Sequence, residues 1–180
     1  MNNMNLPNKL TILRILLVPF IILCFYLPPS WGMWAAVVLF IVASVTDTVD
    51  GRYARAHNMV TDFGKFMDPI ADKLLVNSVL VMLTAQGKVH PVATILFIAR
   101  EFVVSGLRLV AASKGVVLAA GNLGKIKTTL QDIALPFVMV GECWKPFQVI
   151  GLILLYASLV MSVWSGYDYV YKNRNLIQQG

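Results

Sequence analysis

Long apolar stretches alternate with short polar breaks along the whole chain. A helix needs about 20 mostly apolar residues to cross a bilayer, and six stretches have about this length. The predicted spans run from about Leu6 to Leu27, Trp31 to Arg55, Phe63 to Gln86, Pro91 to Ala112, Gly124 to Gly141 and Pro146 to Tyr171. Breaks that contain proline or glycine separate them. The pattern predicts an all-α, polytopic membrane protein with six transmembrane helices in a single domain over residues 1–180.

The composition supports a membrane setting. Apolar residues make up 58% of the chain and charged residues 13%, whereas soluble domains carry about 25% charged residues. The net charge is +6, but no basic helix with interleaved aromatic residues is present, so we expect no nucleic-acid partner. Membrane lipid and an anionic substrate are the expected partners of the basic residues.

Basic residues are unevenly distributed between the links. The links after the first, third and fifth spans are short, and their basic residues are Lys88 and Lys145 alone. The other thirteen Lys and Arg residues lie at the termini, in the even-numbered links or in the adjoining helices. The positive-inside rule then places both termini in the cytoplasm.

Four aspartates gather where the second predicted span ends and the third begins. Asp47 and Asp50 are three residues apart, and Asp68 and Asp72 are four apart, so each pair shares one helix face. Such carboxylates are costly at the edge of hydrocarbon unless cations accompany them. Oxygen ligands without His or Cys select Mg²⁺, Mn²⁺ or Ca²⁺ rather than zinc. Two such ions can clamp the attacking and leaving oxygens of a phosphoryl-type displacement.

Small and basic residues accompany the aspartates. Gly51 and Gly64 allow a ligand to approach the backbone closely, and Ala54 is also small. Arg55 provides a guanidinium fork suited to a phosphate. The alternative is a solvated loop in which the acids form ion pairs with neighbouring cations, and Asp62 fits that alternative better.

These residues resemble the signature of the CDP-alcohol phosphotransferase family, D-x-x-D-G-x-x-A-R-x8-G-x3-D-x3-D. Its fixed positions are matched by Asp47, Asp50, Gly51, Ala54, Arg55, Gly64, Asp68 and Asp72. The resemblance implies six transmembrane helices, usually in a homodimer. It implies a reaction that releases CMP from a CDP-linked substrate and passes the phospho-group to an alcohol. The four aspartates would bind two metal ions, Mg²⁺ or Mn²⁺, and Asp72 would also accept the proton of the attacking hydroxyl.

The resemblance also assigns contacts with the CDP moiety. The residues expected there are Asp50, Gly51, Ala54, Arg55, Thr61 and Gly64. The start of the first span, with Asn8 and Thr11, resembles a family segment that also approaches CDP. Helix capping explains Asn8 and Thr11 equally well.

Basic residues in the fourth and fifth spans indicate a second anionic substrate. They are Arg100 and Arg108 in the fourth span and Lys125 and Lys127 at the start of the fifth. The start of a helix also favours an anion. A phosphorylated alcohol requires this much positive charge, whereas serine or choline does not. Topology control is the alternative for the lysines, and an internal pair with Glu101 or another acid such as Asp132 is the alternative for Arg100.

The short chain, the Arg-Glu and Ser-Gly-Leu-Arg segment and the Gly-Lys-x-Lys-Thr element resemble one bacterial branch of the family. That branch transfers a phosphatidyl group from CDP-diacylglycerol to glycerol 3-phosphate, giving phosphatidylglycerophosphate and CMP. The resemblance covers nearly the whole chain and implies the bacterial inner membrane, with a cytoplasmic active site. Synthases of phosphatidylinositol phosphate or phosphatidylserine are the alternatives within the family. A cation transporter is the alternative from another class, although its acids would be distributed along a pathway.

Overall fold

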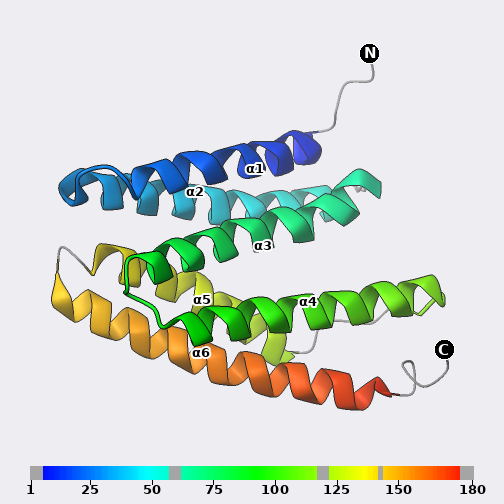
Figure 1. Ribbon diagram of the computed structural model, residues 1–180. Coiled ribbons are helices and arrows are strands. Elements are labelled where there is room, and N and C mark those ends of the chain that lie inside the picture. Colours follow the sequence, from blue (N-terminus) through cyan, green and yellow to red (C-terminus); the bar gives the residue numbers. More distant parts are fainter. Residues whose placement is uncertain (1–5, 57–61, 117–121, 142–143, 175–180) are drawn as a thin grey trace.

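Six α-helices follow one another along the chain of this computed structural model (Figure 1), which describes residues 6–56, 62–116, 122–141 and 144–174. The helices are α1 (Leu6–Cys24), α2 (Pro29–Ala56), α3 (Asp62–Ala85), α4 (Pro91–Ser113), α5 (Asn122–Val140) and α6 (Lys145–Lys172). These bounds follow the six apolar stretches of the sequence, and the described residues contain no strand. The all-α prediction is therefore confirmed.

The helices form two groups of three. In Figure 1, α1, α2 and α3 lie on one side of the bundle, and α4, α5 and α6 lie on the other. Within the groups α1 packs on α2 and α3, and α6 packs on α4 and α5, while α2–α5, α3–α4 and α3–α5 contacts join the groups. Because successive helices run in opposite directions, the start of α1 and the end of α6 lie at the same end of the bundle. This terminal end holds the start of α1, the end of α2 and the start of α3.

Proline and glycine mark several helix boundaries. Helix α4 begins at Pro91, which suits a first helical position because that residue needs no N–H donor. The ring of His90 accepts a hydrogen bond from the Val92 N–H at 3.3 Å and so caps the same helix. Gly87 and Gly115 follow α3 and α4 with φ of 71° and 74°, a conformation that favours glycine.

Apolar side chains fill the core and also cover the outside. The largest buried ones include Ile21, Phe40, Leu75, Leu83, Phe97, Leu135 and Leu155, which together come from all six helices. Large apolar side chains are exposed on all six helices as well, and Phe102 and Val160 are each 71% exposed. A soluble protein rarely exposes so much contiguous apolar surface. The outer surface therefore suits lipid.

One helix in the described part of the chain is long and apolar enough to cross a bilayer by length and composition alone. It is α6, with a mean hydropathy of 2.0 over its most apolar window. The segment Trp31–Thr46 of α2 is apolar but shorter. The six-span topology therefore stays a prediction.

Helices α5 and α6 pack closely at Gly151. A Cβ atom added at Gly151 would lie 2.7 Å from the backbone nitrogen of Val138 and 2.9 Å from the Cβ of Phe137. Since real Cβ atoms do not come so near to backbone atoms, any larger residue would push the two helices apart.

We therefore expect Gly151→Val to lower the midpoint of thermal unfolding in detergent micelles by several degrees, because overpacking of this kind costs about 1–3 kcal/mol. Gly106→Ala in α4 is the matched control, since its added Cβ would meet nothing within 4 Å. Replacing a helical glycine by alanine stabilises by about 0.5–1 kcal/mol. An unchanged midpoint for Gly151→Val would contradict the close α5–α6 contact.

Candidate active site

The aspartate signature lies at the terminal end of the bundle. Helix α2 carries Asp47, Asp50, Gly51, Ala54 and Arg55 near its end, and α3 carries Gly64, Asp68 and Asp72 in its first half. Both aspartate pairs therefore lie on helices, as their spacing predicts. The side chains of Asp68 and Asp72 are described. Thr61 and the side chains of the α2 members and Gly64 lie outside the described residues.

Asp68 connects the start of α3 to the start of α1. The hydroxyl of Thr11 donates a hydrogen bond to Oδ1 of Asp68. Thr11 and Asn8 are both buried, and both lie inside α1, after its first residue, Leu6. Neither therefore occupies the N-cap position. The bond orients the carboxylate of Asp68, which has a second oxygen for another ligand.

The donor chemistry of the signature fits a hard divalent cation. Asp68 and Asp72 provide carboxylate oxygens one helical turn apart, and such oxygens suit Mg²⁺ or Mn²⁺. Among the side chains that the structure describes, no three acidic, His or Cys residues form a metal-sized group. Two of the four predicted ligands, Asp47 and Asp50, fall outside that description. The two-ion site therefore stays a prediction.

A second polar cluster surrounds the carboxylate of Glu101, between α3, α4 and α5. Oε1 of Glu101 contacts Nζ of Lys127 and also Nη1 of Arg100, the latter at 3.0 Å. Oε2 lies 3.5 Å from Nζ of Lys73, which also donates to the hydroxyl of Ser105. Lys127 is 3% exposed. One carboxylate thus faces three cations, and the cluster carries an excess of positive charge.

Arg100 is held on all three of its nitrogens. Besides its contact with Glu101, Nη2 donates to Oγ of Ser165 at 3.1 Å and Nε donates to the carbonyl of Ser162 at 3.3 Å. These bonds tie α4 to α6. Arg100 therefore forms an internal pair with Glu101, which is the alternative that the sequence offered. A contact between Arg100 and a phosphate stays a prediction.

The other two predicted phosphate ligands lie apart from Glu101. Nε of Arg108 donates to the hydroxyl of Tyr169 at 3.2 Å, and its guanidinium carbon lies 5.6 Å from the centre of that ring. Lys125 is exposed in the first turns of α5. The four cations grouped by sequence therefore have three different environments.

The acidic and basic clusters adjoin along α3. Asp72 attracts the charge of Lys127, and Lys73, the next residue along the helix, contacts Glu101. The aspartates of α3 therefore border the cations around Glu101. This arrangement suits two phosphate-bearing substrates that must meet.

Sequence reasoning missed the contribution of α6. The serines on its buried face had a recognisable signal, since three of them recur at helical spacing in an otherwise apolar helix. They are Ser158, Ser162 and Ser165. The hydroxyl of Ser165 and the backbone carbonyl of Ser162 accept hydrogen bonds from Arg100, so this face of α6 meets a cation.

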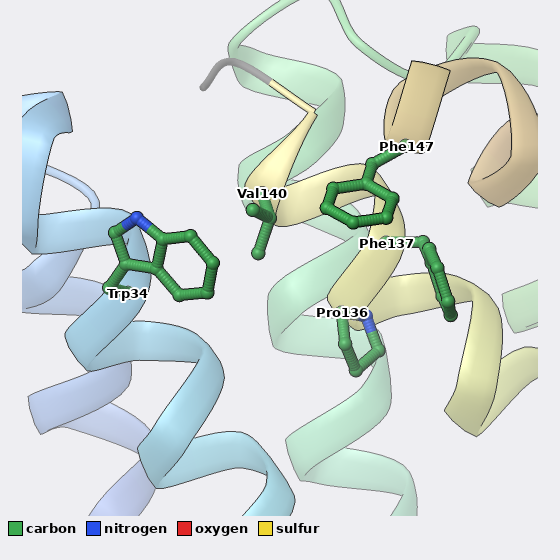
Figure 2. Close-up of a pocket in the computed structure, with 5 residues that line it drawn as sticks. All are labelled: Trp34, Pro136, Phe137, Val140 and Phe147. Carbon is green, nitrogen blue, oxygen red and sulfur yellow. The ribbon is translucent and has the colours of Figure 1, made fainter. Parts of the chain in front are cut away.

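An apolar pocket of about 200 Å³ lies away from both clusters (Figure 2). Its lining residues come from the start of α2, the end of α5 and the start of α6, and they are Trp34, Pro136, Phe137, Val140 and Phe147. These helix ends lie opposite the terminal end of the bundle. The rings of Phe137 and Phe147 meet edge to face with centres 5.5 Å apart. The lining offers no acid or base for catalysis.

Comparison with known proteins adds independent information. The model of the CDP-alcohol phosphatidyltransferase family matches residues 4–164. This match includes the whole aspartate signature and the cluster around Glu101.

Several bacterial proteins are similar over nearly the whole chain. A protein of Bacillus subtilis (strain 168) is 42% identical over 185 residues, covering 94% of this chain and 95% of that protein. A protein of Rickettsia felis is 42% identical, with 92% of this chain and 93% of that protein covered. One of Shigella flexneri is 39% identical with the same coverage. All three bear the name CDP-diacylglycerol–glycerol-3-phosphate 3-phosphatidyltransferase.

The three bonds of Arg100 generate a stability prediction. Arg100→Met is expected to reduce the free energy of unfolding by about 1.5–3 kcal/mol, because a part-buried, charge-assisted contact between α4 and α6 is lost. Arg108→Met should cost less than about 1 kcal/mol, because its contact with Tyr169 is exposed. Thermal unfolding of both variants in detergent micelles measures the difference. Equal losses would mean that Arg100 does not hold α4 to α6.

Proposed function

This chain belongs to the CDP-alcohol phosphatidyltransferase family, and from that premise we propose that it transfers a phosphatidyl group from CDP-diacylglycerol to glycerol 3-phosphate. The products are phosphatidylglycerophosphate and CMP, so the enzyme is a transferase of phospholipid biosynthesis. Similarity over nearly the full length to relatives named for this reaction carries the proposal. The match of every fixed signature position supports the same reaction class.

In this proposal the four aspartates, Asp47, Asp50, Asp68 and Asp72, hold two divalent ions, Mg²⁺ or Mn²⁺. When bound, such ions supply positive charge against the diphosphate of the CDP-lipid. Asp72 accepts the proton of the glycerol 3-phosphate hydroxyl as that oxygen attacks the lipid-proximal phosphorus. The bond from this phosphorus to the oxygen of CMP breaks. Thr11 supports the arrangement by orienting Asp68.

The nucleotide and the acceptor occupy neighbouring regions in this proposal. The CDP moiety contacts Asn8, Thr11, Asp50, Gly51, Ala54, Arg55, Thr61 and Gly64. The phosphate of the acceptor lies towards the cations of α4 and α5, which are Arg100, Arg108, Lys125 and Lys127. The attraction between Asp72 and Lys127 supports this placement, because the acceptor must reach the proposed base.

We further propose that all six helices cross the bacterial inner membrane, with both termini and the active site at the cytoplasmic face, and that the protein is a homodimer. The exposed apolar side chains on all six helices support the membrane setting. The start of α1 and the end of α6 lie at one end of the bundle, which supports an even number of crossings. Lipid tails then reach the terminal end from the side, while CDP approaches it from water.

Asp72→Asn should abolish turnover while the protein stays folded. A positioned general base contributes about 10²–10⁴-fold to a rate, and Asn cannot take up the proton. The measurement is CMP release by purified protein, with the thermal midpoint as the check on folding. Asp168→Asn is the control, because it removes a carboxylate from an exposed pair with Lys172. Normal turnover by a folded Asp72→Asn protein would remove the proposed base.

The acceptor can be tested directly. Purified protein with CDP-diacylglycerol and Mg²⁺ receives glycerol 3-phosphate, serine or inositol phosphate in separate reactions, and CMP release is measured. We expect stimulation by glycerol 3-phosphate alone, because the excess positive charge around Glu101 suits a phosphorylated acceptor. Stimulation by another acceptor would correct the substrate and keep the reaction class. Ion flux in liposomes without CDP-lipid would instead support a transporter.

A further inference from the structure

The cation cluster depends on a single carboxylate, that of Glu101. Helix α3 contributes Lys73, α4 contributes Arg100, and α5 contributes Lys127, and all three cations face Glu101. The side chain of Glu101 is itself 16% exposed. Burying an ammonium or a guanidinium is costly unless a counter-charge accompanies it. Glu101 provides that charge for three helices at once.

Arg100 and Lys127 differ in how firmly they are held. Arg100 keeps its bonds to Ser162 and Ser165 whatever happens at Glu101. Lys127 is attracted by two acids, Glu101 and Asp72. Loss of the Glu101 charge would therefore leave Lys127 drawn towards Asp72, on α3. Lys127 is thus the cation whose position depends most on Glu101.

The chemistry of the two side chains allows a shared role with a phosphate. A lysine ammonium has three N–H donors, so it can contact a carboxylate and a phosphate oxygen at the same time. A direct ion pair between Lys127 and Asp72 would instead use an N–H of the lysine ammonium and would also engage the carboxylate that is the proposed base.

We propose that Glu101 is a positioning residue for the phosphate of the acceptor: it holds the buried ammonium of Lys127 where the same ammonium can also contact that phosphate. The inference rests on the proposed function, and it assigns a role to an acid outside the aspartate signature. Glu101 contacts no substrate atom in this account and acts through Lys127.

The first test separates the two substrates kinetically. We expect Glu101→Gln to raise KM for glycerol 3-phosphate by about tenfold, the equivalent of one charge-assisted hydrogen bond, with KM for CDP-diacylglycerol unchanged. Glu101→Asp, which keeps the charge, should restore part of the loss. Asp168→Asn, which opens an exposed lysine pair, should change neither KM. An unchanged or lower KM for glycerol 3-phosphate in folded Glu101→Gln protein would overturn the proposal, as would an equal rise for both substrates.

A second test asks whether Glu101 acts through Lys127. Lys127→Met should raise KM for glycerol 3-phosphate, and adding Glu101→Gln to it should raise KM little further, because the two residues work as one unit. The double variant leaves Lys73 and Arg100 without the acid, one cation fewer than Glu101→Gln leaves alone. It should therefore cost less stability, and it provides a second measurement where Glu101→Gln does not fold. A further tenfold rise in the double variant would show a separate route and overturn the proposal.

A third test does not depend on turnover. Inorganic phosphate should raise the thermal midpoint of the unaltered protein in detergent micelles more than chloride does at equal ionic strength. Glu101→Gln should lose this difference, and the Glu101→Gln/Lys127→Met protein should lack it too. Equal protection of all three proteins would overturn the role of Glu101. By contrast, no stimulation of CMP release by glycerol 3-phosphate in the unaltered protein would overturn the proposed function alone.

Discussion

A positive charge inside an apolar helical bundle is stable only beside a counter-charge, and three such charges in this chain share the carboxylate of Glu101. The ion pairs of Glu101 therefore connect α3, α4 and α5. Hydrogen bonds from Arg100 to Ser162 and Ser165 connect α4 to α6 as well. At the end opposite the termini, aromatic and aliphatic side chains line an apolar pocket (Figure 2). The ion pairs around Glu101 lie apart from that pocket.

The aspartates of the signature and most of the cluster around Glu101 lie on different helices. The aspartates lie on α2 and α3, whereas Arg100 and Glu101 lie on α4 and Lys127 lies on α5. The two groups meet along α3, where Asp72 attracts Lys127 and Lys73 reaches Glu101. A transfer between two phosphate-bearing substrates needs positive charge on both sides of the reacting centre. In the proposed function, metal ions held by the aspartates would supply it on the acidic side, and lysine and arginine would supply it on the other.

The helices could be predicted from the sequence because the signals that fix them are local. Apolar length, proline at a helix start and glycine in a left-handed turn are each readable within a few residues, as at Pro91 and Gly87. The aspartate pairs were predictable for the same reason, since each spans about one helical turn. Helix capping was the wrong interpretation for Thr11, because its hydroxyl donates to Asp68 on another helix. A partner so far away in the sequence has no local signal.

The cation cluster could not be predicted in the same way. Lys127 and Glu101 are 26 residues apart, and Arg100 and Ser165 are 65 apart. Their meeting depends on how each helix is rotated about its own axis. That rotation is set by close packing at positions such as Gly151, where α6 lies against the backbone of α5. Sequence reasoning grouped four cations that the fold distributes among three environments, and it did not include Lys73, which contacts Glu101.

Packing on α6 also separates the roles of the two cations that meet at Glu101. A Cβ at Gly166 would lie 3.0 Å from Cγ of Arg100, so the small residue leaves space for the arginine stem. Ser162 and Ser165 then engage the guanidinium, and α6 fixes Arg100 independently of any ligand. Lys127 has no such clamp among these α6 contacts, and its position reflects the balance between Glu101 and Asp72. A fixed cation maintains the shape of the site, whereas one held between two acids can respond to an arriving phosphate.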